Sequence, residues 1–181
     1  VHHGNGTQDL TIDDPSILAM SIHRHPYWPM TGDMKHVGNG DAKGSNVNLP
    51  FFKYAGDQAY LDVYDQVIAP KLREFQPEQI LVFAGYDGHW QDPLADHRLS
   101  VSGYNQLVQR LTDSAEELCG GLISFALGGG YKLEPLAQCV AGSLHTLLGL
   151  KNAFDDPIGD SPDEQRAYPD RIAELVKHHL S

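Results

Sequence analysis

Short apolar runs alternate along the chain with longer stretches of helical spacing. The runs that predict β-strands are Ile17–His23, Asn46–Phe51, Gln79–Tyr86 and Leu122–Leu127. The second run alternates polar and apolar residues, which favours a strand at a sheet edge. The last two runs are almost continuously apolar, as expected of central strands buried on both faces. This succession of strands and helices predicts an α/β fold with a mostly parallel sheet.

Apolar residues three and four positions apart predict the helices between these strands. The first stripe contains Tyr60, Val63, Tyr64, Val67 and Ile68. Asp57 is the candidate N-cap of this helix, and Pro70 is expected to kink or end it. Ser100 or Ser102 is expected to cap the next helix. Further stripes cover 104–118, 133–147 and 172–176.

Two segments lack such periodicity. Residues 25–45 contain four glycines and two prolines: Gly32, Gly38, Gly40, Gly44, Pro26 and Pro29. A long loop inside a compact domain is usually functional or mobile. The acidic segment 155–169 is interpreted as a surface linker to a last helix. Because one domain typically takes about 100–200 residues, residues 1–181 are expected to form a single domain.

Composition narrows the class of protein. The 181 residues carry 13 Lys+Arg against 24 Asp+Glu, a formal charge of −11, which argues against direct binding to nucleic acid. Hydrophobic residues make up 41% and charged residues 20%, which is a globular balance. No apolar run approaches the ~18–20 residues that span a bilayer. Only Cys119 and Cys139 are present. We therefore expect a soluble, cytoplasmic protein that does not bind membranes.

Chemistry-bearing residues occupy the chain start and one strand end. The opening segment His2–Thr7 places two imidazoles beside glycines that allow a tight turn. The alternative interpretation is a solvated end or the remnant of a tag. Asp87 follows a predicted buried strand, at the end where open α/β sheets bind ligands. The alternative role for Asp87 is to cap the following turn.

A run of glycines, Gly128–Gly130, leads from the last predicted strand to Tyr131. It would let a substrate approach the backbone and would place a phenol at the mouth of the sheet. A phosphate loop is disfavoured because neither glycine-rich phosphate motif is present; a structural turn with Tyr131 in the core is the other alternative. Jointly, an imidazole and a carboxylate suit a zinc ion with an open position, and a phenol can donate to an oxyanion.

The motifs taken together resemble the zinc-dependent histone deacetylase family, in its bacterial branch with acetoin-utilisation proteins and acetylpolyamine amidohydrolases. Val1–Thr7 matches the family pattern Asp-x-His-His-Gly-Asn-Gly-Thr from its second position. The segments that follow in the family's order are Ser21–His23, Pro29–Gly32, Gly85–Asp87, Asp92–Pro93 and Gly129–Tyr131. The resemblance covers about residues 1 to 150. It implies an arginase/deacetylase-type three-layer fold with flanking helices, of which this chain would be the carboxyl-terminal half.

The resemblance implies a role for each matching residue. His2 and Asp87 would be ligands of one zinc ion, and Tyr131 would donate a hydrogen bond to the substrate carbonyl. Asn5 would orient one histidine of the family's catalytic pair. Ser21 would contribute to a structural site for a monovalent cation such as K⁺.

The resemblance also implies a narrow channel for an acylated amine, lined by Trp28, Leu94 and Gly129. The expected substrate is an acetylated lysine or an acetylated polyamine, whose methylene stem suits aromatic and aliphatic walls. Three residues depart from the common pattern at the channel rim: Met30, Gly128 and Lys132. These departures bear on the choice of substrate more than on the type of reaction.

The first zinc-binding Asp of the family pattern and its upstream histidine pair have no counterpart in residues 1–181. We therefore expect a fragment whose partner is the missing amino-terminal half of the same domain, and which is inactive alone. One alternative is an arginase-like ureohydrolase, although His89 cannot bridge two hard cations as a carboxylate does. The other is a deacetylase-like module that binds acylated ligands without hydrolysing them.

Overall fold

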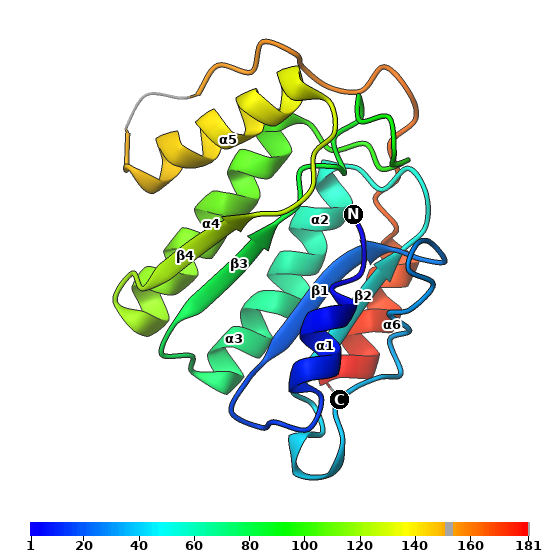
Figure 1. Cartoon of the computed structure of the whole chain (residues 1–181), viewed down its shortest axis with the longest axis vertical. Helices are drawn as coiled ribbons and strands as arrows, with labels where there is room; N and C mark the ends of the chain where they lie inside the picture. Colours follow the sequence, from blue (N-terminus) through cyan, green and yellow to red (C-terminus); the bar gives the residue numbers. More distant parts are fainter. Residues whose placement is uncertain (151–153, 181) are drawn as a thin grey trace.

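Each of the predicted apolar runs forms a strand in the computed structural model, which describes residues 1–150 and 154–180 (Figure 1). The strands are β1 (Ala19–Arg24), β2 (Asn46–Phe51), β3 (Ile80–Ala84) and β4 (Ile123–Leu127). The α-helices are α1 (Asn5–Thr11), α2 (Asp57–Val63), α3 (Ala69–Phe75), α4 (Val101–Cys119), α5 (Leu133–Leu147) and α6 (Pro169–Leu180). A 3-10 turn, η1 (Gly40–Ala42), and a π-helical segment, η2 (Tyr64–Ile68), complete the described elements. The predicted α/β fold with parallel strands is confirmed.

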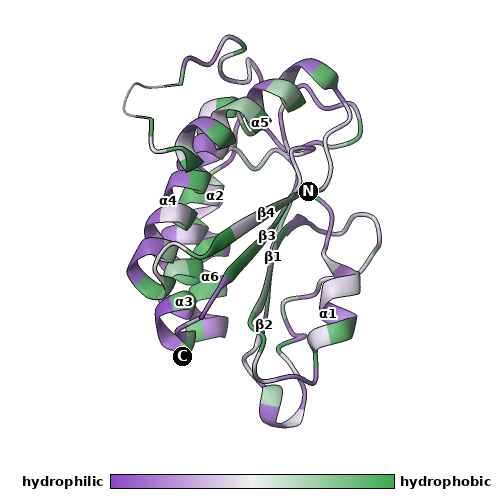
Figure 2. Cartoon of the chain, turned by 60° about the vertical axis from the view of Figure 1, so that its left-hand side comes forward, coloured by the Kyte–Doolittle hydropathy of each residue, from purple (hydrophilic) through white to green (hydrophobic). Residues whose placement is uncertain are grey.

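The strands form two parallel pairs that lie in one layer and run in the same direction (Figures 1 and 2). β1 pairs with β2, and β3 pairs with β4. Within residues 1–150 and 154–180 no hydrogen-bonded ladder joins β1 to β3. Val1 lies between their carboxyl ends: its carbonyl oxygen accepts from the Arg24 N–H at 2.9 Å, and its amino nitrogen lies 2.7 Å from Asp87 Oδ1. The two carboxyl ends therefore meet around the start of the chain.

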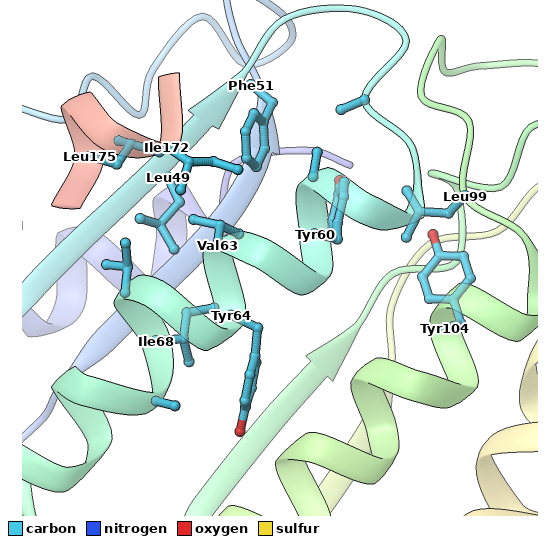
Figure 3. Close-up of a cluster of buried hydrophobic side chains, with 14 of the residues drawn as sticks. Leu49, Phe51, Tyr60, Val63, Tyr64, Ile68, Leu99, Tyr104, Ile172 and Leu175 are labelled. Atoms are coloured by element: carbon cyan, nitrogen blue, oxygen red, sulfur yellow. The ribbon is translucent and has the colours of Figure 1, made fainter. Parts of the chain in front are cut away.

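The hydrophobic core lies between the strands and the helices on one side of the layer (Figure 2). In Figure 3, side chains of β2 and α6 pack against α2 and η2, among them Leu49, Phe51, Val63, Ile68, Ile172 and Leu175. The opposite face of β3 is uncovered, with Leu81 74% and Phe83 77% exposed. The expectation that the last two strands are buried on both faces is therefore wrong, because the helices of this chain cover only one face of them.

The predicted edge strand β2 pairs with β1 alone among the described strands, and yet all its residues are buried. Polar side chains on it bond to the loop that precedes it: Asn46 Nδ2 donates to the His36 carbonyl, and Asn48 Nδ2 to the Asp33 carbonyl at 3.1 Å. On α6, the His179 Nε2 lies 3.0 Å from the Asn48 carbonyl. A helix and a loop thus cover the edge, which removes it from solvent.

Asp57 does not cap its own helix. Gly56 is the N-cap of α2, and the Asp57 carboxylate instead accepts from the N–H and Oγ of Ser100, at 2.8 and 2.6 Å. Ser100 in turn caps α4 by accepting from the Gly103 N–H at 2.9 Å, as one of the two candidates predicted. Burial raises the pKa of Asp57. The Asp57 side chain therefore links the first residue of α2 to the N-cap of α4 instead of capping α2.

The apolar face continues beyond Pro70, where a kink or the end of the helix was expected, and Leu72 is 4% exposed. The π-helical segment η2 separates α2 from α3, and the Ala69 N–H donates to the Tyr64 carbonyl five residues earlier. Pro70 then occupies the first turn of α3, where its missing N–H has little cost. The chain therefore runs through three consecutive helical segments, α2, η2 and α3, where a kink or the end of the helix was expected.

The remaining segments also pack closely. Helix α1 was not predicted from the opening motif. Residues 155–168 of the predicted linker are irregular but lie against the body: the Arg166 N–H donates to the Tyr54 carbonyl at 2.8 Å, and Trp90 Nε1 donates to the Gly159 carbonyl at 2.9 Å. No helix among the described residues is both long and apolar enough to cross a membrane.

Acid is expected to weaken the fold through its buried histidines. Burial lowers the pKa of His97 to about 3 and that of His179 to about 4, so both stay neutral in the folded chain while the unfolded chain takes up protons near pH 6.5. The contribution of each histidine to the unfolding free energy is therefore fully present above pH 6.5. As the pH falls below 6.5, this free energy decreases by roughly 1.4 kcal/mol per pH unit for each histidine, until the pH reaches the pKa of the folded state. Urea unfolding at pH 7 and pH 5 measures the slope.

A His97→Gln variant isolates one of these contributions. In this variant the slope of the unfolding free energy against pH should decrease by the contribution of about one proton. His36→Gln, at an exposed position, should leave the slope unchanged. Equal slopes in His97→Gln and the parent chain would contradict this explanation.

The exposed apolar face of β3 is expected to make this chain self-associate. Replacing Leu81 and Phe83 with Lys should lower the association seen by sedimentation, because an apolar patch of this kind is an association site. Leu10→Lys is the matched control, since Leu10 is 87% exposed on α1. If the control reduces association as much as the double variant does, the β3 face is not responsible.

Candidate active site

The side chains of His2 and Asp87 meet at the carboxyl ends of the strands. His2 Nδ1 lies 2.8 Å from Asp87 Oδ2. Asp87 is 1% exposed, and a buried carboxylate requires polar partners because an unpaired one is costly. Its second oxygen, Oδ1, is 2.7 Å from the Val1 amino nitrogen. The imidazole and the carboxylate that the sequence singled out, 85 positions apart, are therefore in direct contact.

The glycine-rich loop approaches Asp87 so closely that no side chain fits. The Tyr86 N–H donates to the Gly129 carbonyl at 2.9 Å. A Cβ atom on Gly129 would lie 2.7 Å from the Asp87 Cγ. The glycines were expected to let a substrate approach the backbone, and Gly129 is also needed for the contact with Asp87.

Tyr131 emerges from this loop at the surface. Its side chain is exposed (52%), so the alternative that it packs in the core is wrong. Its backbone N–H donates to Asp92 Oδ2 at 2.8 Å. The loop therefore carries a solvent-accessible phenol only two residues beyond the glycine that touches Asp87.

The predicted channel residues Trp28 and Leu94 are exposed on neighbouring loops, at 72% and 51%. Tyr27 joins the two loops, since its hydroxyl donates to the Leu94 carbonyl. The Tyr27 ring also stacks on His2, with centroids 5.7 Å apart and planes at 24°. Tyr27 was not predicted as a site residue. The one feature of the sequence that pointed to it was its position in a proline-containing loop without hydrophobic periodicity.

Behind His2 lies a group of buried histidines. His3 Nδ1 is 2.8 Å from Thr31 Oγ1, and its ring lies 4.7 Å from that of His23. His23 Nε2 donates to the Gly32 carbonyl at 2.9 Å when it carries the proton. Burial lowers the pKa of His3 and lowers that of His23 to about 3. Both rings are therefore neutral and fix the backbone that presents His2.

The two remaining predicted residues lie nearby. Ser21 Oγ accepts from the Gly4 N–H at 3.3 Å and is 3.0 Å from His23 Nδ1. Asn5 begins α1, and its N–H donates to the His3 carbonyl at 2.9 Å. The contact of Gly4 with Ser21 anchors the opening motif to β1. The cation-binding role of Ser21 and the histidine-orienting role of Asn5 stay predictions.

The donors at this site suit zinc in kind, since neutral imidazole and carboxylate are common zinc ligands. Catalytic zinc usually takes three protein ligands. Among residues 1–150 and 154–180, no group of three or more His, Cys, Asp and Glu side chains could hold a metal ion. The donor atoms of His2 and Asp87 thus fit the chemistry of a zinc site, and their role as zinc ligands stays a prediction.

The residues that a two-manganese ureohydrolase would use have other partners. Asp92 is 7% exposed and accepts from the backbone N–H groups of Leu94 and Tyr131. Burial lowers the pKa of His89 to about 4, and its Nδ1 accepts from the Gln91 N–H at 3.1 Å. Because these atoms hold loops together, the arrangement favours one metal ion over two.

Comparison with known proteins identifies the family. Residues 1–147 match the model of the histone deacetylase domain. The chain is 44% identical over 160 residues to histone deacetylase 10, chloroplastic, of Oryza sativa subsp. japonica, covering 87% of this chain and 36% of that protein. It is 30% identical over 161 residues to a histone deacetylase-like amidohydrolase of Pseudomonas aeruginosa, covering 88% and 42%.

A solved structure agrees with these matches. The crystal structure of the HDA15 HD domain superposes with a TM-score of 0.85 at 30% identity, covering 99% of this chain and 49% of that one. The chain therefore spans less than half the length of these relatives, while nearly all of it shares their fold.

The contact between Gly129 and Asp87 predicts a steric effect. A Gly129→Ala substitution should lower the unfolding free energy by about 1–3 kcal/mol, because the added methyl group overlaps the Asp87 carboxyl. Gly6→Ala is the control: its Cβ would meet nothing within 4 Å, and alanine favours the helix by up to about 1 kcal/mol. Thermal melting compares the two, and a Gly129→Ala variant as stable as Gly6→Ala would contradict the contact.

Proposed function

Because this chain belongs to the histone deacetylase family, we propose that it forms part of a zinc-dependent amide hydrolase that removes acetyl groups from amines. The observation that carries this proposal is the contact between His2 and Asp87, beside the loop that presents Tyr131. The contact places an imidazole and a carboxylate at one point, next to a phenol-bearing loop. Family membership supports the reaction class, deacetylation.

His2 and Asp87 would hold the zinc ion, together with a third ligand from outside residues 1–181. When bound, zinc polarises an amide carbonyl and lowers the pKa of a water ligand to about 7. The buried Asp87 would give that site its negative charge. His2 would be kept in place by the stacked ring of Tyr27.

Tyr131 would donate its phenolic proton in a hydrogen bond to the substrate carbonyl oxygen, whose negative charge grows in the tetrahedral intermediate. Trp28 and Leu94 would form the channel walls with Gly129, and would exclude water from the methylene stem of the substrate. Asn5 would orient a proton-handling histidine of the amino-terminal half, and Ser21 would help to bind a monovalent cation such as K⁺.

An acetylated lysine and an acetylated polyamine remain the two substrate classes of this proposal. The formal charge of −11 favours encounter with cationic molecules, and molecules of both classes can carry further positive charges. The similarity to an amidohydrolase as well as to histone deacetylases supports an amide substrate without choosing between them.

A non-catalytic binding module is the second candidate, and one observation favours it: no group of three or more His, Cys, Asp and Glu side chains among residues 1–150 and 154–180 could hold a metal ion. The two candidates differ in turnover. A longer protein that contains an Asp before Val1 and an upstream histidine pair should hydrolyse acetylated amines, whereas residues 1–181 alone should not.

The test of Tyr131 uses that longer protein and a Tyr131→Phe substitution. Loss of one oxyanion donor typically costs about 10²–10³ in kcat, so this variant should lose at least that much deacetylase activity while its zinc content is unchanged. Acetyl-lysine peptides and acetylpolyamines serve as substrates, and metal analysis gives the zinc content.

Tyr168→Phe is the matched control for this experiment. It also removes one phenolic hydroxyl, which donates to the Lys53 carbonyl at 2.7 Å, and it should retain full activity. If Tyr131→Phe retains most of its activity, the proposed role of Tyr131 is wrong. If neither substrate class is turned over by the longer protein with zinc bound, the proposed hydrolase function is wrong.

A further inference from the structure

We propose that Asp92 is a positioning residue for Tyr131, which it holds by a buried hydrogen bond to the Tyr131 backbone. This inference deepens the proposed function and rests on it for its catalytic consequence. Its structural part stands independently, on the contacts of Asp92 itself.

The two oxygens of Asp92 serve two different loops. Oδ1 accepts from the Leu94 N–H at 2.9 Å and so closes a turn within its own loop. Oδ2 accepts from the Tyr131 N–H at 2.8 Å, 39 positions later in the sequence. Asp92 is 7% exposed, and hydrogen bonds to a carboxylate are stronger than those between neutral groups. One buried side chain therefore links the loop after β3 to the loop after β4.

The loop before Tyr131 gives a reason for this link. Gly129 must lack a side chain because Asp87 lies against it, and Gly130 has φ of 134°, a conformation that favours glycine. Such residues leave the backbone many alternatives, and α5 begins only at Leu133. Tyr131 therefore lies between a conformationally permissive segment and a helix, and its side chain is 52% exposed. The hydrogen bond to Asp92 supplies a restraint on its backbone.

A second link joins the same two loops at the surface. Lys132 Nζ donates to Gln91 Oε1 at 2.9 Å. Consecutive residues of one loop thus hold consecutive residues of the other. Asp92 is both charged and buried, whereas Lys132 is charged but exposed. The positioning of Tyr131 is therefore assigned to Asp92.

The competing explanation is that Asp92 only caps its own turn. The contact with Leu94 N alone would satisfy that role, as Asp14 illustrates: its Oδ1 accepts from the Ser16 N–H at 2.9 Å in an exposed turn. Asp14 forms the same local turn without a link to Tyr131. An Asp14→Asn substitution is therefore the matched control.

The first experiment uses residues 1–181 and needs no activity. Asparagine at position 92 keeps one acceptor oxygen and presents an NH₂ group in place of the other, so it can serve Leu94 or Tyr131 but not both. Amide hydrogen exchange followed by NMR should show the Tyr131 N–H exchanging about 10- to 100-fold faster in Asp92→Asn. Asp14→Asn should leave it unchanged. Exchange of Tyr131 within twofold of the parent in Asp92→Asn would overturn the proposal.

A second variant covers the case in which Asp92→Asn does not fold. In Asp92→Ser the short hydroxyl can still close the local turn with Leu94 but cannot also hold Tyr131. It should stay folded by circular dichroism and show the same faster exchange of the Tyr131 N–H. An unchanged Tyr131 N–H in Asp92→Ser would also overturn the link.

The second experiment uses the longer, active protein and separates positioning from general loss of structure. Asp92→Asn should lower kcat by about tenfold or more with little change in KM. In a Tyr131→Phe background the same substitution should cost less than about twofold, because the two residues act as one unit. Full additivity would show that Asp92 does not act through Tyr131. An inactive parent protein would refute the proposed function, while the exchange experiment would still decide the link.

Discussion

The parallel direction of β1 and β3 is the constraint on which the site depends. Because both strands end at the same edge of the layer, the loops that follow them converge there, and Val1 is held between them by the Arg24 N–H and the Asp87 carboxylate. The contact of His2 with Asp87 follows from that placement. Reversing either strand would separate these residues by the length of the sheet.

Polar side chains can be buried at this edge of the sheet because the histidines are neutral and the carboxylates accept hydrogen bonds. His23 has a pKa near 3 because it is buried, so it adds no positive charge behind His2. Asp57 accepts two hydrogen bonds from Ser100, 43 positions later, and Asp92 accepts one from Leu94 in its own loop and one from the distant Tyr131. The two carboxylates therefore act as fixed connections between segments of the chain, because each of their oxygens accepts a hydrogen bond.

The sequence predicted what depends on local patterns. β2 has the bounds that alternation indicated, and β3 and β4 lie within the predicted apolar runs. The meeting of His2 and Asp87 was an expectation of the family resemblance, which made both of them ligands of one zinc ion. Burial of the two faces of β3 could not be predicted, because an apolar run does not show whether helices cover both faces or one. The roles of Asp57 and Tyr27 depend on partners distant in the sequence, which no local pattern records.

The π-helical segment η2 has a mechanical consequence for the whole helix 57–75. A π-turn contains one residue more than an α-turn, and each residue of an α-helix turns the chain by about 100°. Winding Tyr64–Ile68 as a regular α-helix without removing a residue would rotate everything after it by about that angle. Leu72, now 4% exposed, would then leave the core. The inserted residue thus sets the phase between the two halves of this helix.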